Sequence, residues 1–159
     1  MPKLIVLAFL QNQWFQRPHG VERIYAQHAG DYDHLAKLDA AYLFMGCLTG
    51  RRLKNAFGTS ARHDIIWQNA SPKIAGKSNG VFPADVPHML RIIEHFQPKI
   101  VIGFGSVAVP PLRRMKDAGA PWHFVQAPHP AARHATVPQE LADAARRVRE
   151  FSELEATHA

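Results

Sequence analysis

Short apolar segments of strand length alternate along this chain with longer segments that have the spacing of helices. The apolar segments cover residues 4–10, 64–68, 100–103 and 122–126, and turn-forming residues bound each of them. Strands that alternate with helices favour right-handed crossovers and a parallel sheet with helices on both faces. The pattern therefore predicts an α/β fold, a three-layer α/β/α sandwich around a central, mostly parallel, four-stranded sheet.

Helical spacing is clearest in three places. One helix is expected after Asp85, a candidate N-cap, and before Pro98. A shorter helix is expected before Gly119, and the last helix opens with a capping-box pattern at residues 136–139. The apolar stripe of the first of these helices consists of Val86, Met89, Leu90, Ile93 and Phe96.

The chain has the size and composition of one globular domain, residues 1–159. At 47% hydrophobic and 20% charged it is neither disordered nor membranous, and its longest apolar run is too short to span a bilayer. Cys47 is the single cysteine, which excludes an internal disulfide or a multi-cysteine metal site, and we expect it to be a small buried thiol. These properties predict a soluble, intracellular, cytoplasmic protein that acts as a monomer and has no membrane partner.

The chain is basic. Nineteen Lys and Arg against thirteen Asp and Glu give a net charge of +6, and ten histidines add positive charge in mild acid. Because a basic surface attracts anions, we expect an anionic partner.

Polar side chains follow three of the predicted strands. Gln11 and Asn12 follow the first strand, Asn69 follows the second, and His129 follows the fourth. Ligands of open parallel sheets bind outside the carboxyl ends of the strands, so we expect these side chains to converge on one edge of the sheet. The alternative for each asparagine is an ordinary turn former whose side chain satisfies the local backbone.

His129 lies between Pro128 and Pro130, which fix the backbone on both sides of the imidazole. Such a setting suits a proton donor that must be held in one geometry, and a structural turn with an exposed histidine accounts for it equally well. His123 and His134 are near His129 in sequence, but strand alternation places His123 away from the loop that holds the other two. We therefore expect no metal site.

Residues 103–108 follow a predicted strand and fit G-x-G-x-x-A, the form of a dinucleotide-binding turn. Pro110 and Pro111 are expected to disrupt the helix that should begin at the phosphate, which favours a glycine turn that allows close backbone packing. Residues 76–78 look like the end of a phosphate-binding P-loop, but Ser71 occupies the position of the required glycine. The P-loop interpretation is excluded.

Five segments of the chain resemble, in their order and spacing, the uracil-DNA glycosylase superfamily. Residues 10–15 resemble its first motif, and residues 43–53 resemble a segment of its iron–sulfur branch. Residues 64–69 look like the strand that ends in the uracil-reading asparagine. Residues 98–108 and 128–133 are similar to a glycine-containing strand motif and to the H-P-[SA] motif. The resemblance spans nearly the whole chain and implies the superfamily's fold and its activity on DNA.

The resemblance implies a role for each matching residue. Phe44 would stack on an extruded base, and Asn69 would recognise the base edge through the donor and the acceptor of its amide. His129 would donate a hydrogen bond to O2 of the departing uracil anion. Asn12 would hold the attacking water, and Gln11 would line the pocket.

The chain departs from the family pattern in several places. Gln13 and Leu10 stand where the family has proline and glycine, and the cluster cysteines are absent, so neither an iron–sulfur cluster nor another cofactor is expected. The loop after His129 lacks the bulky apolar wedge of the relatives, so Arg133 or His134 fills the vacated stack or the enzyme favours single strands. Contacts with DNA are expected from residues in or near the strand-end loops, namely Arg51, Arg52, Lys73, Lys77, Arg133 and His134.

These expectations combine into one hypothesis and two alternatives. The hypothesis is a DNA repair enzyme of base excision repair that flips uracil out of single- or double-stranded DNA and hydrolyses its N-glycosidic bond, leaving an abasic site. The first alternative is a nucleic-acid-binding protein that keeps this fold without catalysis. The second is a dinucleotide-dependent enzyme that uses Gly103 to Ala108.

Overall fold

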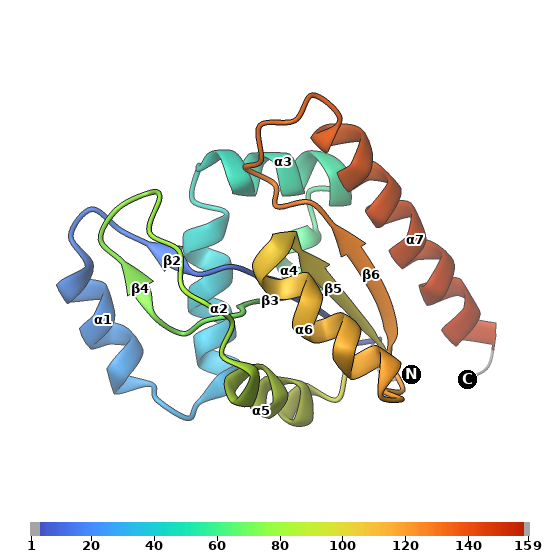
Figure 1. Ribbon diagram of the computed structural model, residues 1–159, viewed down its shortest axis with the longest axis horizontal. Coiled ribbons are helices and arrows are strands. Elements are labelled where there is room, and N and C mark those ends of the chain that lie inside the picture. The colour runs from blue at the N-terminus through green and yellow to red at the C-terminus, as the bar shows by residue number, and fades with distance from the viewer. Residues whose placement is uncertain (1–3, 158–159) are drawn as a thin grey trace.

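The computed structural model describes residues 4–157 and has the predicted architecture, with a parallel sheet between two layers of helices (Figure 1). The central sheet has four strands in the order β3-β1-β5-β6, and every neighbouring pair is parallel. The strands are β1 (Val6–Leu10), β3 (Ile66–Asn69), β5 (Ile100–Phe104) and β6 (His123–Ala127). The predicted three-layer α/β/α fold is therefore confirmed.

Helices cover both faces of this sheet. One face packs against α3 (Leu48–Phe57), α4 (Ala61–Asp64) and α7 (Val137–Thr157), and the other packs against α5 (Val86–Phe96) and α6 (Gly105–Asp117). The helix α2 (Tyr32–Leu43) packs along the edge strand β3 and contributes buried residues to both faces. The two hydrophobic layers that result are the core of the molecule.

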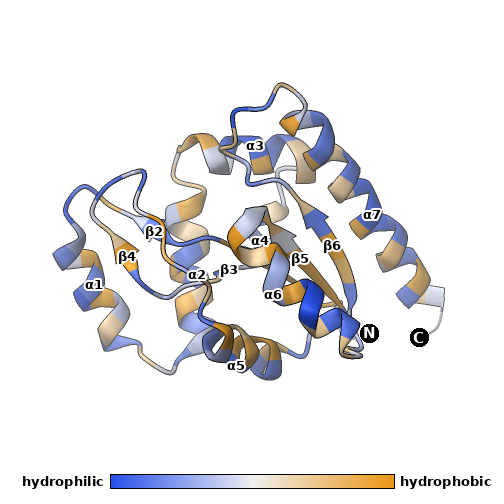
Figure 2. Ribbon diagram, in the orientation of Figure 1, coloured by the Kyte–Doolittle hydropathy of each residue, from blue (hydrophilic) through white to orange (hydrophobic). Residues whose placement is uncertain are grey.

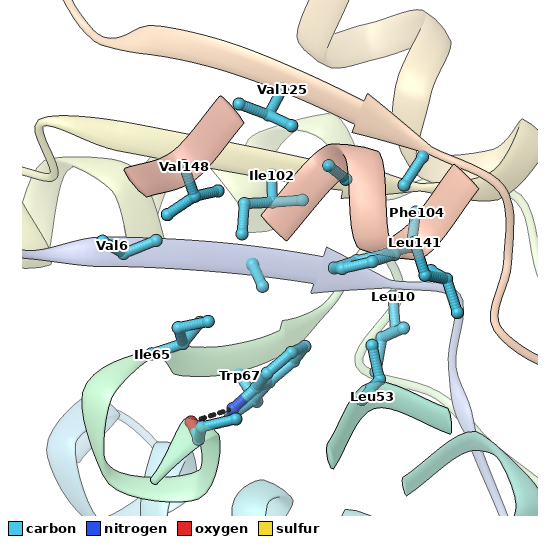
Figure 3. Packing of buried hydrophobic residues seen from close by; sticks show 14 of the residues in the cluster. Val6, Leu10, Leu53, Ile65, Trp67, Ile102, Phe104, Val125, Leu141 and Val148 are labelled. Atoms are coloured by element: carbon cyan, nitrogen blue, oxygen red, sulfur yellow. Dashed lines mark hydrogen bonds between the residues drawn. The ribbon is translucent and has the colours of Figure 1, made fainter. Parts of the chain in front are cut away.

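Side chains of β1 alternate between the two layers. Val6 and Leu10 belong to the layer under α3 and α7, whereas Leu7 and Phe9 belong to the layer under α5 and α6. Figure 3 shows the first layer, in which the indole Nε1 of Trp67 donates a hydrogen bond to the carbonyl oxygen of Ala61 at 2.9 Å. Because β1 and β5 are buried along their whole length, they read as continuous apolar runs in the sequence.

A small second sheet lies beside the main one. Its two parallel strands are β2 (Gln13–Trp14) and β4 (Ile74–Ala75), and the helix α1 (Pro18–Gln27) packs next to β4. In Figure 1 this unit stands away from α7, on the other side of α2. The small sheet connects the segment after β1 to the segment after β3, and both of these segments carry predicted site residues.

The three helices predicted from the sequence are confirmed as α5, α6 and α7, but the expected effect of the prolines in α6 is wrong. The carboxylate of Asp85 caps α5 by accepting a hydrogen bond from the backbone N–H of His88 at 3.1 Å. The helix α6 begins at Gly105 and continues through Pro110 and Pro111, so the expected disruption by these prolines is wrong. They lie in its second turn, where a proline has no N–H to donate, so only the carbonyl groups of Ser106 and Val107 lose the helical donor four residues later. The sequence did not predict α1, α2 or α3.

Polar residues gather on the outer faces of the helices, and the strands are mostly apolar (Figure 2). Across residues 4–157 no helix is both long enough and apolar enough to cross a membrane.

Candidate functional site

A cavity of about 380 Å³ lies at the carboxyl ends of β1 and β3. Its walls come from the segment after β1, the end of α2, the end of β3, the loop that contains Gly80, and the loop after β6. Gln11, Asn12, Asn69 and His129 all line it. The structure thus brings together the four polar residues that follow the predicted strands.

Backbone hydrogen bonds continue past the ends of β1 and β3 and connect two walls of the cavity. Leu10 pairs with Asn69 at the end of the β1–β3 ladder. Past the strands the pairing continues, because the backbone N–H of Ala70 donates to the carbonyl oxygen of Leu10 at 3.0 Å and that of Ser71 donates to Gln11 at 3.1 Å. The positions of Gln11 and Asn69 are therefore set by the sheet register.

The imidazole of His129 is prepared as a neutral hydrogen-bond donor. Its Nδ1 accepts a hydrogen bond from the backbone N–H of Ala131 at 3.1 Å, so in the neutral ring the proton is on Nε2. Burial lowers the pKa of His129 below its ordinary value, because the charged form loses hydration. At neutral pH the ring therefore offers one N–H donor in the cavity wall and carries no charge.

Two arginines of α3 hold the loops around this histidine. The Nη1 atom of Arg52 donates to the carbonyl oxygen of Pro130 at 2.7 Å and to that of Ala132 at 3.0 Å. The Nη1 atom of Arg51 donates to the carbonyl oxygen of Gly46 at 2.7 Å, in the loop between α2 and α3. Arg52 is half-buried and engaged with protein backbone, whereas Arg51 is exposed.

The side-chain amide of Asn12 makes its hydrogen bonds with backbone groups of the protein. Its Nδ2 donates to the carbonyl oxygens of Gln13 and Gly80, both at 3.0 Å, and its Oδ1 accepts from the backbone N–H of Phe82 at 3.3 Å. Both amide hydrogens are used, so Asn12 closes the loop around Gly80 over the cavity. These contacts do not include the water that the resemblance assigns to Asn12.

Asn69 and Gln68 bring amides without partners to the cavity. The Asn69 side chain, 8% exposed, makes no hydrogen bond to any residue in the described part of the chain. Gln68 is 4% exposed, and its Nε2 is buried without a partner among those residues. A buried amide donor without a partner costs free energy, so these groups suit a ligand with its own donors and acceptors. Gln68 was not predicted as a site residue, although a polar residue within an apolar strand indicates a possible functional role.

A buried carboxyl group also lines the cavity. Asp39 of α2 is 6% exposed, and its Oδ1 accepts hydrogen bonds from the hydroxyl of Tyr25 and, at 3.4 Å, from Nε2 of Gln13. Burial raises the pKa of Asp39 to about 7, because ionisation in the interior loses hydration, while the hydrogen bonds from Tyr25 and Gln13 partly oppose this rise. The sequence reasoning missed Asp39 because it did not predict α2.

Phe44 does not line this cavity. It follows the last residue of α2, is half-buried, and packs edge-on against Trp67 with ring centroids 5.5 Å apart. The aromatic side chains that do line the cavity include Phe15 and Tyr42, whose rings meet edge-on at 4.9 Å. A flat ligand would therefore meet Phe15 or Tyr42 rather than the predicted Phe44.

Two exposed apolar residues line the cavity, and several exposed basic residues are close in sequence to other lining residues, Ser78 and Ala131. Met45 is 72% exposed and Trp14 is 48% exposed, and both belong to the cavity lining. The predicted DNA-binding residues Lys77, Arg133 and His134 are exposed. Lys73 is also exposed, and its Nζ lies 5.7 Å from the ring centroid of Phe82.

Cys47 is exposed and lines the cavity, so the expectation of a buried thiol is wrong. The residue caps the N-terminus of α3, where its Sγ accepts a hydrogen bond from the backbone N–H of Gly50 at 3.4 Å. The thiol donates to the carbonyl oxygen of Leu43 at 3.2 Å. A capping position at a helix end on the surface explains its exposure.

His123 does not share a site with His129 and His134. Nε2 of His123 lies 3.0 Å from Oε1 of Glu155, and its ring stacks on Phe151, so His123 faces α7. This agrees with the expectation that strand alternation separates His123 from His129. Within residues 4–157 no group of three or more His, Cys, Asp or Glu side chains is placed to hold a metal ion.

Gly103, in the segment 103–108, allows α6 to pack closely against β5. A Cβ atom on Gly103 would lie 2.9 Å from Cδ1 of Leu112, so the expected close approach of α6 to β5 is confirmed. A second cavity of about 530 Å³ borders Gly105, and Glu140, Asp143 and Arg147 also line it. Two acidic residues in this lining are unfavourable for a dinucleotide pyrophosphate.

No protein-family model matches this chain, and a search of the curated proteins finds no significant match either. The chemistry of the site therefore rests on the residues described above.

Proposed function

We propose that this protein is a DNA glycosylase that hydrolyses the N-glycosidic bond of uracil in DNA and leaves an abasic site. The observation that carries the proposal is that one cavity of about 380 Å³ is lined by neutral His129 and by the amides of Gln68 and Asn69. Neither amide has a hydrogen-bond partner in the described part of the chain. A base that has been flipped out of the stack is a planar ligand of matching chemistry.

Base recognition would use the amides of Asn69 and Gln68. An amide offers a donor and an acceptor side by side, which fits the O4 acceptor and the N3–H donor of uracil. Cytosine presents the reverse pattern at these positions, so its binding would leave buried groups unpaired. The burial of Gln68, at 4% exposed, makes an unsatisfied partner costly and so favours selection of one base.

Bond cleavage would use His129. As the C1′–N1 bond breaks, its electron pair moves to the base, and the negative charge spreads to O2. The Nε2–H donor of neutral His129 would stabilise that charge, which develops only towards the transition state. A neutral donor also avoids attracting the phosphates of undamaged DNA into the cavity.

Contact with DNA would use the rim of the cavity. The exposed apolar side chains of Met45 and Trp14 are suited to stacking with bases, and exposed Arg51, Lys77 and Arg133 are suited to phosphates. The net charge of +6 supports an anionic partner. Arg52 would act indirectly, by holding the loop after His129.

The test is base release from a uracil-containing oligonucleotide, followed by alkali to break the strand at each abasic site. We expect strand breaks with uracil and none with a matched oligonucleotide that contains thymine or cytosine. H129A should lower turnover more than affinity, and N69D should weaken the selection of uracil. Absence of breaks on both single- and double-stranded uracil substrates would refute the proposal.

A nucleic-acid-binding protein without catalysis is the second candidate. The contacts of Asn12 favour it, because both of its amide hydrogens bond to backbone carbonyls. Binding that weakens as salt rises, together with no base release, would support this candidate.

A further inference from the structure

We propose that Asp39 positions the attacking water, the role that the resemblance assigns to Asn12, and that it also accepts a proton from this water. This inference rests on the proposed glycosylase function. It assigns a residue of α2 to the reaction, in a segment where the resemblance indicates no catalytic residue.

The two oxygens of the Asp39 carboxyl group differ in their surroundings. Oδ1 is held by the hydroxyl of Tyr25 and by Nε2 of Gln13, which come from α1 and β2. Oδ2 accepts no hydrogen bond from the residues that the structure describes. A carboxyl group with one oxygen fixed and the other free is suited to orient a water molecule.

The cavities around Asp39 provide room for that water. Asp39 lines the 380 Å³ cavity and also a smaller one of about 40 Å³. Gln13, Gln68 and Asn69 line both, so the small cavity adjoins the place where the base would bind. A space of this size with several polar walls can hold an ordered water molecule.

The electrostatic surroundings make Asp39 a base of suitable strength. Burial and the adjacent Asp39 carboxyl raise the pKa of Tyr25 far above its ordinary value, so this hydroxyl stays protonated and remains a donor. Lys73 and His88 share the small cavity with Asp39, and no ion pair joins either of them to Asp39 within residues 4–157. With a pKa of about 7, the carboxylate is substantially ionised at neutral pH and can still accept a proton.

The other titratable residues that share a cavity with Asp39 line the large cavity. Tyr42 is on the same helix and lines the large cavity. Cys47 and His129 line that cavity as well, and His129 is neutral because burial lowers its pKa. We therefore attribute a pH dependence with a midpoint near 7 to Asp39 rather than to His129.

The reaction balances with these two side chains. The water oxygen forms a bond to C1′ of the deoxyribose, and one water proton passes to Oδ2 of Asp39. The C1′–N1 bond breaks, its electron pair leaves with uracil, and the Nε2–H of His129 stabilises the resulting anion. Solvent then protonates the uracil anion, and Asp39 returns its proton to solvent. The ionised carboxylate also stabilises the positive charge that develops on the sugar before the water bond is complete.

The experiment compares wild type with D39N in single-turnover base release across pH 5 to 9. We expect the wild-type rate to rise with pH through a midpoint near 7 and then level off. D39N should be slower by about 10²–10⁴-fold, with no such midpoint, because the general base is lost. Its affinity for the uracil oligonucleotide, measured by titration, should change little. A D39N enzyme with the wild-type rate and pH profile would overturn the assignment while leaving the glycosylase function intact.

A second variant tests the same assignment if D39N fails to fold. Y25F keeps the carboxyl group and removes a hydrogen bond that stabilises its ionised form, so the midpoint of the pH profile should move to higher pH. An unmoved midpoint would overturn the role of Asp39. A wild-type protein that releases no uracil at any pH would instead refute the proposed function itself, and this inference with it.

Discussion

The guanidinium group of Arg52 lies against the backbone of Pro130, and its Nη1 donates to the Pro130 carbonyl oxygen at 2.7 Å. This contact joins α3 to the loop after β6, which carries His129, although the two residues are 78 positions apart in sequence. The side chain also reaches the carbonyl oxygen of Ala132. Arg52 therefore fixes the conformation of the loop that carries His129, the proposed hydrogen-bond donor to the departing base.

Replacing Arg52 should slow base release and leave the salt dependence of DNA binding unchanged. R52A loses two charge-assisted hydrogen bonds, which should lower the free energy of unfolding by about 2 kcal/mol in urea denaturation. Base release should slow because His129 loses its support. The matched variant is R133A, which removes an exposed arginine and should reduce the salt slope of binding by about 1 with little loss of stability. If R52A also reduces the slope of DNA affinity against salt concentration, Arg52 contacts a phosphate of the DNA.

Replacing Gln68 by Met should stabilise the fold and weaken recognition of uracil. The variant removes a buried amide donor that has no partner in the described part of the chain, and relief of that penalty should raise the free energy of unfolding by about 1–3 kcal/mol. The control is Q11M, in the same cavity but half-exposed, which should gain little. Urea denaturation and oligonucleotide titration give the two readouts. Equal stability of Q68M and wild type would mean that water already satisfies this amide.

Replacing Gly105 by Ala should lower activity through His129. Gly105 has φ of +86°, and a Cβ atom there would lie 3.0 Å from Cβ of His129. The control is G119A, at φ of +103°, where no other atom lies within 4 Å of the added Cβ. Both variants should lose about 1 kcal/mol of stability from backbone strain, and only G105A should slow base release. Equal rates for the two variants would show that His129 tolerates the displacement.

The lowered pKa of His129 should make stability fall in mild acid. The folded protein binds a proton at this ring less readily than the unfolded chain, whose histidine titrates near 6.5, so unfolding takes up a proton as the pH drops below that value. H129Q should therefore lose less stability than wild type between pH 7 and pH 5. Nuclear magnetic resonance of the imidazole should find Nδ1 without a proton at pH 7. A ring that titrates above 6.5 in the folded protein would contradict the expected direction.

Replacing Met45 by Ala should separate activity on duplex DNA from activity on single strands. Met45 is 72% exposed at the mouth of the cavity, where its side chain can enter the space that a flipped base leaves. A single strand needs no such filling, so M45A should slow base release mainly from duplexes. L154A removes a side chain that is 48% exposed at the end of α7 and serves as the control. A uniform effect of M45A on both substrates would argue against this role.

The sheet was predictable because its two central strands, β1 and β5, are buried on both faces. Residues 4–10 and 100–103 read as unbroken apolar runs, and they became β1 and β5. The helices α1 and α2 gave a weaker signal. No residue of α1 is buried, and the buried face of α2 consists mainly of small side chains around the charged Asp39. Neither pattern has the wide apolar stripe that identifies a helix from sequence.

The candidate site was predictable where chain order alone decides the position. Asn69 ends β3 and His129 comes two residues after the end of β6, so their meeting at one edge of the sheet follows from the fold. The environment of each side chain was not predictable. Phe44 packs on Trp67, and the amide of Asn12 bonds to backbone carbonyls, because both depend on loops that the sequence pattern does not describe. The burial that distinguishes Gln68 and Asp39 likewise arises only from tertiary packing.

The position of Cys47 makes the unmodified protein convenient for labelling. It is the single cysteine of the sequence, it is exposed, and it lines the cavity that holds His129. A maleimide dye would therefore attach at one known place beside the site without any engineered substitution. Its fluorescence would report directly on occupancy of the cavity, and a bulky reagent there would act as a covalent inhibitor.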